Sequence, residues 1–470
     1  MKAQDSITSS HTNIKPSETE GLYVKRKKII PREVKGFFAR FRTLSVFLLL
    51  GVYYIVPWIN WDGRQAILFD LPARKFYVFG LVFWPQDFIY LTCLLIIAAL
   101  SLFFFTALAG RLWCGYACPQ TVWTETFLWL ERLFEGSRDH QLRLQKMPWN
   151  REKVLRKGGK QLAWIVYALI TGFTFVGYFT PIRELGFQLV QGEAGFWPTF
   201  WVFFYGFATY GNAGFLREQI CIYMCPYARF QSAMFDRDTL IISYDTKRGE
   251  PRGPRNRSVD PKTLDLGDCI DCKLCVQVCP TGIDIRDGLQ YQCIACAACI
   301  DACDSVMEKM NYPKGLIRYT TENTMEGKKP HIMRPRIIIY GTVLLLLLAA
   351  AIYSITIRVP LIVDVIRDRN SLFRPAENGL VENVYMLKLL NKDLRPHTYI
   401  VSINGIPEAR LIGDFPVNLD AGHVIELPVR VQADPLKMEE AAATIVFEVH
   451  ALDNRNIAVH EKSRFIGRSR

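Results

Sequence analysis

The sequence is poor in histidine, and no histidine falls in a long apolar segment. The seven are His11, His140, His331, His397, His423, His450 and His460. Haems of the b type in membranes need axial histidine ligands, so this placement argues against a haem-carrying membrane anchor. No G-x-G-x-x-G follows a predicted strand and no Walker sequence occurs, which leaves nucleotide binding without support.

Residues 1–36 lack a short apolar stretch followed by a small-residue cleavage site, so they do not resemble a signal peptide. They are polar and end in the basic run KRKKIIPREVK, and we expect a disordered basic cytoplasmic tail. The net charge of +12 comes without a nucleic-acid fold signature. Because basic residues mark the cytoplasmic loops of membrane proteins, we expect no nucleic-acid partner.

Long apolar segments, by contrast, are plentiful. Half of the 470 residues are hydrophobic and 13% are aromatic, as is typical of membrane proteins. A helix needs about 20 apolar residues to cross a bilayer, and the candidates are 39–59, 88–109, 162–181, 196–215 and 337–357. Segment 196–215 is rich in aromatic and small residues, so we expect it to pack against protein more than lipid. The sequence therefore predicts a five-span α-helical bundle that is surrounded by membrane lipid.

Lysine and arginine are distributed unevenly between the loops, which predicts the orientation. Eight basic residues lie between Lys25 and Arg42 and eight more between Arg138 and Lys160, whereas the loop after the third span carries only Arg183. The N-terminus and the loops after the second and fourth spans are therefore predicted to be cytoplasmic. With five spans, residues 358–470 then lie in the periplasm of a bacterium, outside its inner membrane.

The region after the fifth span has a different texture. Segments such as VIELPVRVQA and ATIVFEVHAL alternate apolar and polar residues and are separated by turn residues. Short alternating strands over about 100 residues are typical of an all-β immunoglobulin-like sandwich. Residues 358–470 contain no cysteine, so we expect no antibody-type disulfide there.

Eight of the thirteen cysteines form two runs with the spacing C-x2-C-x2-C-x3-C, which is the spacing of bacterial two-cluster ferredoxins. In such ferredoxins the fourth cysteine of each run binds the cluster of the other run. The predicted ligands of one 4Fe-4S cluster are Cys269, Cys272, Cys275 and Cys303, and those of the other are Cys293, Cys296, Cys299 and Cys279. Disulfides are disfavoured on the reducing cytoplasmic side, and zinc ribbons use pairs of cysteines rather than runs of four.

One departure from the ferredoxin pattern is Asp304, which stands where a proline usually follows the second run. We expect it to alter the local turn without removing a ligand. Residues 236–268, before the first run, are rich in arginine, proline and glycine. They are predicted to form an ordered linker on the cytoplasmic surface, ahead of an α+β ferredoxin domain that moves single electrons.

Four further cysteines occur in a repeated motif, Cys-x-Tyr-x-Cys-Pro, where hydrophobic segments end. They are Cys114 and Cys118 in the first copy, and Cys221 and Cys225 in the second. Positions i and i+4 share one face of a helix, so each pair can converge on one ion, although the proline favours a helix end near the second cysteine. Three interpretations stand open: structural cysteines, a third cluster shared by both pairs, and a soft-metal or redox-active dithiol site.

The ordered combination of two C-x3-C-P motifs, a double ferredoxin run, a fifth span and an exported sandwich resembles the CcoG family, also called FixG or RdxA. The resemblance extends to the linker YDTKRGEPRG at residues 244–253. It implies an accessory protein of cbb3-type cytochrome c oxidase that reduces Cu(II) to Cu(I), with Cys114, Cys118, Cys221 and Cys225 as catalytic and copper-binding residues. It also implies copper chaperones, a copper transporter and oxidase assembly factors as partners.

The resulting domain layout has five parts. They are the tail 1–36, a four-span membrane domain at 37–235, the linker and ferredoxin domain at 236–336, the fifth span at 337–357 and the sandwich at 358–470. The sequence names no electron donor and leaves the oligomeric state open, a homo-oligomer included. Two alternatives are a polyferredoxin similar to the NapH type, which passes quinol electrons to a periplasmic reductase, and a non-catalytic assembly scaffold.

Overall fold

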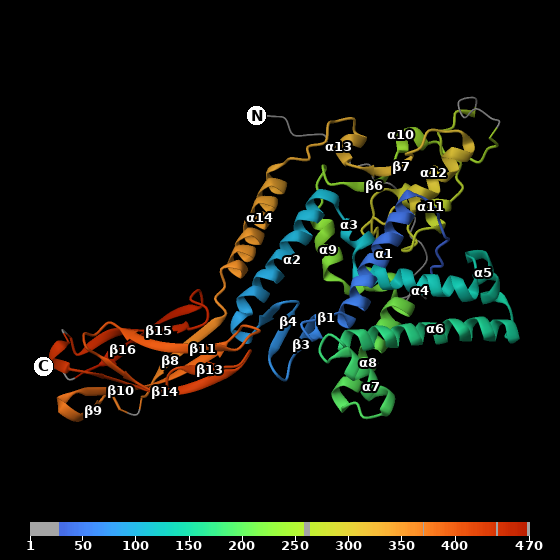
Figure 1. Ribbon diagram of the computed structural model, residues 1–470. Coiled ribbons are helices and arrows are strands. Elements are labelled where there is room, and N and C mark those ends of the chain that lie inside the picture. The colour runs from blue at the N-terminus through green and yellow to red at the C-terminus, as the bar shows by residue number, and fades with distance from the viewer. Residues whose placement is uncertain (1–27, 258–263, 370, 439, 468–470) are drawn as a thin grey trace, which may run out of the picture.

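A computed structural model describes residues 28–257, 264–369, 371–438 and 440–467 (Figure 1). Ferredoxin-type elements lie at one end of a long helix, α14, and a β-sandwich lies at its other end. The remaining helices stand between these two levels. Below, the two ends are called the ferredoxin side and the sandwich side.

Within the described part of the chain, four helices are long and apolar enough to cross a membrane. They are α1 (Phe37–Ile55), extended by a 3₁₀ turn (Val56–Trp58), α2 (Phe88–Ala109), preceded by a 3₁₀ turn (Pro85–Asp87), α6 (Arg151–Val176) and α14 (Pro335–Thr356). Helix α6 begins eleven residues before the predicted segment 162–181 and ends five before its end, because its basic first turns continue the helix beyond the apolar stretch. α14 packs along α2.

The predicted span 196–215 corresponds to α8 (Phe196–Thr209), which continues directly into a π-helical segment, η3 (Tyr210–Leu216). The 14 residues of α8 are too few to cross a bilayer as a single α-helix. As expected for this segment, α8 packs closely on a protein neighbour, α6: a Cβ on Gly172 would lie 2.3 Å from the carbonyl oxygen of Val202. Absent side chains at Gly172 and Gly206 therefore allow the two backbones to touch.

Shorter elements connect these helices. Between α2 and α6 they are α3 (Leu112–Tyr116), α4 (Pro119–Glu135) and α5 (Arg138–Lys146), and after η3 they are the π turn η4 (Ile220–Met224) and α9 (Pro226–Met234). On the sandwich side they are the hairpin β1 (Asn60–Trp61) with β2 (Arg64–Gln65), the three-stranded antiparallel sheet β3 (Ile67–Asp70), β4 (Lys75–Val78) and β5 (Leu81–Phe83), and α7 (Ile182–Gln191).

The ferredoxin-type part is small and mixed. It contains β6 (Ile241–Tyr244), α10 (Thr246–Gly249), α11 (Leu274–Gln277), a 3₁₀ turn (Ile285–Asp287), α12 (Ala298–Met310), β7 (Ile317–Thr320) and α13 (Glu322–Met325). Strands β6 and β7 pair antiparallel. The segment predicted as a linker thus supplies one of the two strands, and residues 258–263 of it lie outside the described residues.

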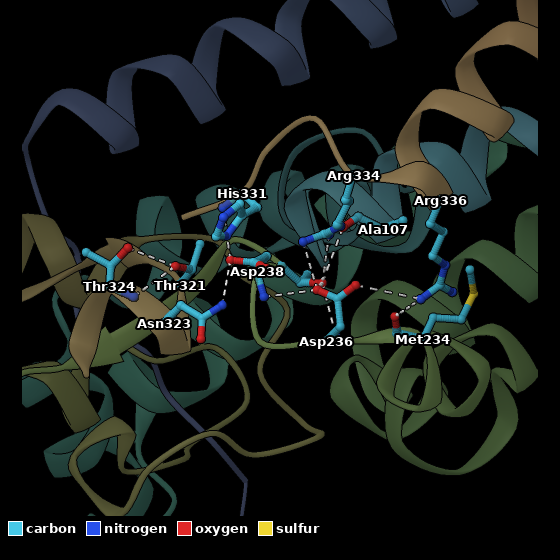
Figure 2. A network of polar contacts seen from close by, with 11 residues as sticks. Ala107, Met234, Asp236, Asp238, Thr321, Asn323, Thr324, His331, Arg334 and Arg336 are labelled. Carbon is cyan, nitrogen blue, oxygen red and sulfur yellow. Dashed lines mark hydrogen bonds and ion pairs between the residues drawn. The ribbon is translucent and has the colours of Figure 1, made fainter. Parts of the chain in front are cut away.

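A polar network joins the ferredoxin-type part to the membrane helices (Figure 2). Arg334, just before α14, donates to the backbone carbonyl of Ala107 near the end of α2 and forms an ion pair with Asp236 at 2.8 Å. Asp238 accepts hydrogen bonds from the Asn323 side chain at 2.7 Å and from the His331 backbone at 3.1 Å. The strand pair β6–β7 is therefore tied to the start of α14.

Residues 28–36 differ from the predicted disordered tail, whose residues 1–27 lie outside the described residues. Ile30 is buried, the backbone N–H of Arg32 donates to the carbonyl of Gln277 at 2.8 Å, and Lys28 pairs with the buried Glu131. Burial alone would raise the pKa of Glu131, but Arg217 and Lys28 hold it at about 2. The charges of the basic run are therefore used, in part, to anchor the chain.

The C-terminal part is the predicted β-sandwich. One sheet has the order β12-β14-β10-β8, with β9 on β10, and the other has the order β13-β11-β15-β16. The strands are β8 (Leu361–Arg367), β9 (Arg374–Pro375), β10 (Val381–Asn391), β11 (His397–Asn404), β12 (Arg410–Ile412), β13 (Val417–Leu419), β14 (Val424–Ala433), β15 (Ala442–Ala451) and β16 (Ala458–Ile466). Buried Tyr385, Tyr399 and Phe447 fill the space between the sheets.

Candidate iron–sulfur and dithiol site

The eight ferredoxin cysteines gather around two cavities. One cavity is lined by Cys269, Cys272, Cys275 and Cys303. The other is lined by Cys279, Cys293, Cys296 and Cys299, and also by Cys275. The structure therefore brings together each set of four that the spacing predicts, with the last cysteine of each run crossing to the other set.

The backbone of both runs takes the same unusual shape. Asp271 and Lys273 flank the second cysteine of the first run, and Ala295 and Ala297 flank that of the second; all four have positive φ, between 51° and 59°. Residues other than glycine seldom adopt this left-handed conformation, and it is found most often at functional sites. The two loops thus curl around their cavities in equivalent ways.

Burial sets the chemistry of these thiols. It raises the pKa of Cys275, Cys293 and Cys303 to about 12. Such thiols are neutral at pH 7 in the metal-free chain, whereas a coordinated thiol is deprotonated outright. Each set supplies four soft sulfur donors, all of them buried or partly buried except the exposed Cys272. Such sets fit 4Fe-4S clusters, which are held by four thiolates.

Asp304 follows the last cysteine of the second run and does not end the helix there. Helix α12 continues through it to Met310, and its carboxylate accepts a hydrogen bond from the backbone N–H of Gly315 at 2.9 Å. Because no proline follows the second run, the helix continues past its last cysteine. All four cysteines of the run still line the two cavities.

Both Cys-x-Tyr-x-Cys-Pro motifs fold alike at their second cysteine. Cys118 and Cys225 have extended backbone and directly precede the prolines that begin α4 and α9. Proline favours the first position of a helix, so each thiol lies at a helix N-terminus, where the dipole favours a thiolate. Burial still raises the pKa of Cys118, although the backbone N–H groups of Thr121 and Gln120 oppose the rise.

The first cysteines of the motifs lie on different kinds of helix. Cys114 is in the short α-helix α3, whereas Cys221 is in the π turn η4. In both copies the helix ends before the second cysteine, so the two thiols of a pair do not share one continuous helix. π-helical turns are rare and occur frequently at functional sites.

The two motifs meet in space. Burial raises the pKa of Cys114 to about 12, with added contributions from the nearby thiols of Cys118 and Cys221. Burial likewise raises the pKa of Cys221 to about 11, with added contributions from Cys118 and Cys225. The Cys114 thiol is also hydrogen-bonded to Gln231, which lies on α9, the helix that begins directly after Cys225. The four cysteines therefore lie in one region and are named here the dithiol group.

Two further observations describe the surroundings of this group. The Cys114 thiol donates to the side-chain oxygen of Gln231 at 3.3 Å, and Gln231 is fully buried on α9. Among the described residues no three His, Cys, Asp or Glu side chains stand close enough for one metal ion, and this includes the ferredoxin cysteines as well as the dithiol group.

The first motif lies directly against the loop of the second ferredoxin run. Cys114 packs against the buried apolar cluster that contains Cys296, and Cys299 packs against the same cluster. The hydroxyl of Tyr116, the tyrosine of the motif, contacts that of Tyr319 at 3.4 Å, and Tyr319 donates to the carbonyl of Ala295 at 2.6 Å. The predicted electron-carrying residues and the dithiol group are therefore neighbours.

Arg111 is a site residue that the sequence reasoning missed. Its buried guanidinium donates to backbone carbonyls of Ala228, Tyr291 and Cys293, the last at 3.4 Å. It lowers the pKa of Cys114, Cys221 and Cys293, although burial outweighs it at each. Its position just after the apolar segment 88–109 is the sequence signal that could have identified it.

Gly115 allows α3, the helix that carries Cys114, to lie close to the loop of the second ferredoxin run. A Cβ at this position would lie 2.7 Å from the carbonyl oxygen of Ala295, which is closer than real Cβ atoms approach. We expect Gly115→Ala to displace α3 from the cluster loop and to slow electron passage to the dithiol group, since a misplacement of ~1 Å can cost ~100-fold in rate. Stopped-flow oxidation of the reduced protein measures this rate.

The matched control is Gly158→Ala on α6, where an added Cβ meets nothing within 4 Å. It should leave both the cluster spectrum and the rate unchanged. An unaltered rate in Gly115→Ala would mean that electrons do not pass through this contact.

Family models agree with this reading of the parts. A 4Fe-4S binding domain matches residues 91–136, a 4Fe-4S dicluster domain matches residues 216–322, and the Ig-like fold at the C-terminus of FixG matches residues 351–468. Together with the four apolar helices, they define a membrane protein of the iron–sulfur oxidoreductase class that carries two 4Fe-4S clusters. The relatives found narrow the class further.

The nitrogen fixation protein FixG of Rhizobium meliloti is 38% identical over 427 residues, which cover 83% of this chain and 82% of that protein. Protein RdxB of Cereibacter sphaeroides is 42% identical, with coverages of 82% and 84%. The chain belongs to the FixG/RdxA family, as its motifs predict. The crystal structure of a FixG-related protein from Vibrio parahaemolyticus is 37% identical and covers 23% of this chain and 97% of its own, with a TM-score of 0.22.

Proposed function

We propose that this chain reduces Cu(II) to Cu(I) at the dithiol group and supplies the reduced ion for assembly of a cbb3-type cytochrome c oxidase. The observation that carries the proposal is that Cys114 packs against the buried apolar cluster that contains the ferredoxin cysteine Cys296. A soft sulfur site in contact with a one-electron relay is the arrangement that a one-electron reduction of copper requires.

The chemistry follows from the donor set. When bound, the two 4Fe-4S clusters supply single electrons. Each Cu(II) substrate ion takes up one electron, and the soft thiolates of the dithiol group then favour the Cu(I) product. Two thiols that were oxidised to a disulfide would give up two electrons and reduce two Cu(II) ions. Arg111 offsets the negative charge of the thiolates, and Gln231 holds Cys114.

The membrane arrangement belongs to the same proposal. α8 and η3 together form a helical stretch of 21 residues, Phe196–Leu216, which supplies a fifth crossing in addition to the four long helices. The basic loops then place the ferredoxin side in the cytoplasm and the sandwich in the periplasm of a bacterial inner membrane. Copper chaperones, a copper transporter and oxidase assembly factors are the partners that this placement suits.

A second candidate function rests on one specific observation. The family model for a 4Fe-4S binding domain covers residues 91–136, which include Cys114 and Cys118. Four thiols from two motifs can hold one cubane, so the dithiol group would then carry a third cluster, and the chain would be an electron relay to another reductase.

One experiment separates the two functions. The purified protein is reduced anaerobically, mixed with Cu(II) and a Cu(I)-specific chelator, and analysed for iron and by EPR. Copper reduction requires chelated Cu(I) to form catalytically, with an iron content that fits two clusters. An iron content that fits three clusters, with no Cu(I) formed, would replace the first function by the second.

A further inference from the structure

A cavity of about 120 Å³ lies between the two redox centres on the ferredoxin side. Its walls come from the start of α1, from α4, from the segment around η4 and from the ferredoxin loops. Cys221 of the dithiol group lines it, and so does Cys296 of the second ferredoxin run. A molecule in this cavity, named here the α1–α4 cavity, would therefore touch both predicted electron carriers. Neither the copper proposal nor the cluster assignment uses this space.

One part of the cavity carries donors and acceptors of hydrogen bonds. The Glu125 carboxylate lies 3.2 Å from the Arg132 guanidinium and 3.8 Å from that of Arg42, and it accepts a hydrogen bond from the Trp129 indole at 3.0 Å. Arg42 also donates to the carbonyl of Cys296 at 3.2 Å. The Glu125 carboxylate is therefore linked through Arg42 to the backbone of the loop that holds Cys296.

Another part of the lining is apolar and includes Leu128, Trp129, Val278 and Ile294. Further polar residues line the cavity as well, among them the threonines Thr43, Thr121 and Thr124 and the charged residues Arg32, Glu33, Arg217 and Glu218. A pocket that combines apolar walls with a few fixed polar groups is typical of a small-molecule site. An apolar cavity of ~150 Å³ holds a benzene ring, so this space of about 120 Å³ admits no more than one ring and is too small for a three-ring flavin.

The cavity also borders the lipid-facing surface. Ala39, Arg42 and Thr43 of α1 line it. Leu44, the next residue, and Phe47, about one turn after Thr43, are exposed on 60% and 64% of their surface. The Phe47 ring contacts Trp129 at 5.5 Å between ring centres. A molecule dissolved in the membrane therefore has a short way to the cavity.

We propose that the α1–α4 cavity binds the head group of a membrane hydroquinone and is the site at which electrons enter the protein. The hydroquinone is a single ring with an apolar tail, its hydroxyl donates to the Glu125 carboxylate, and the carbonyl of the product quinone accepts from Arg132. Oxidation of one hydroquinone gives one quinone, two protons and two electrons. The protons leave to cytoplasmic water, and the electrons pass singly to the cluster of the Cys296 set.

This inference rests on the proposed electron route through the ferredoxin cysteines, but it does not depend on copper as the final acceptor. It names the class of donor that the sequence left open. It also accounts for the membrane location of the chain, because a lipid-soluble donor is available only there.

Binding is tested first, with the full-length protein and its clusters in nanodiscs and with decylubiquinone as the probe. We expect saturable quenching of tryptophan fluorescence. Thr124→Met, which adds bulk to the cavity wall, should weaken binding at least ~10-fold, whereas Thr124→Ser should not. Thr199→Met places the same change on α8, outside the cavity lining, and is the matched control. If Thr124→Met fails to fold, Thr43→Met fills the cavity from α1.

Electron entry is then tested with decylubiquinol. It should reduce the clusters, seen as bleaching of the visible spectrum, in the wild type and not in Thr124→Met, while dithionite reduces both. Wild-type affinity for decylubiquinone in Thr124→Met, or displacement of the probe by added anionic phospholipid, would overturn the site. Cu(I) formation by protein that was reduced with dithionite and freed of the excess, without cluster reduction by quinol, would overturn this inference alone. The reverse result would overturn copper reduction alone.

Discussion

Replacing both cysteines of either motif with alanine, Cys114/Cys118 or Cys221/Cys225, should abolish Cu(II) reduction while the cluster spectrum survives. The four thiols lie in one region, so the loss of one pair removes two of the four soft donors that copper can use there. Mutation of residues outside the first coordination sphere of a metal already lowers its affinity or the activity about 10–100-fold. We therefore expect the rate of Cu(II) reduction to fall more than ~100-fold here. The chelator assay for Cu(I) measures it on protein that has been reduced with dithionite and then freed of the excess, and EPR checks the clusters.

Cys93→Ala is the matched control, since Cys93 is a partly exposed cysteine within α2, away from both motifs. It should reduce Cu(II) at the wild-type rate. Undiminished reduction in the paired variants would move copper reduction to the clusters themselves. A fall of a third in iron content in those variants would instead identify the dithiol group as the ligands of a third cluster.

The cluster-binding part was predictable because its information is local. The spacing of eight cysteines within 35 residues, Cys269 to Cys303, determines which thiols can share a cubane, and both cavities are lined accordingly. The sandwich was predictable for a similar reason, since strand alternation is a short-range pattern. Helices α1, α2 and α14 followed from apolar length alone.

Tertiary packing determines the rest, and no short-range pattern reports it. The sequence suggested that the dithiol group could meet, but its contact with the cluster loop depends on a missing side chain at Gly115 and on the buried charge of Arg111. Similarly, nothing in the basic run distinguishes Lys28 from the neighbouring lysines. Its pairing with Glu131, 103 residues away, is visible only in the structure. Segment 196–215 was ambiguous because its helix changes from α to π at Tyr210, a change that hydropathy does not register.

A long-range contact of the same kind joins the sandwich to the membrane helices. Asp87, at the start of α2, lies 2.5 Å from the Arg358 guanidinium at the end of α14 and 2.7 Å from the ammonium of Lys392 after β10. All three side chains are nearly buried, Lys392 to 95%. Trp84 and Leu390 pack beside them in a shared apolar cluster. One carboxylate thus compensates two buried cations.

Asp87→Ala should therefore destabilise the docked sandwich strongly. Removing one member of a buried charge network leaves the others uncompensated, which costs ~3–5 kcal/mol. The control is Glu426→Ala, which breaks the exposed Lys388–Glu426 pair and should cost less than ~1 kcal/mol. Proteolysis between α14 and β8, together with thermal unfolding, measures both variants. Because the sandwich has its own core of buried Tyr385, Tyr399 and Phe447, we expect faster cleavage at this junction in Asp87→Ala while the sandwich itself resists. Equal cleavage rates in the two variants would show that Asp87 does not hold the sandwich in place.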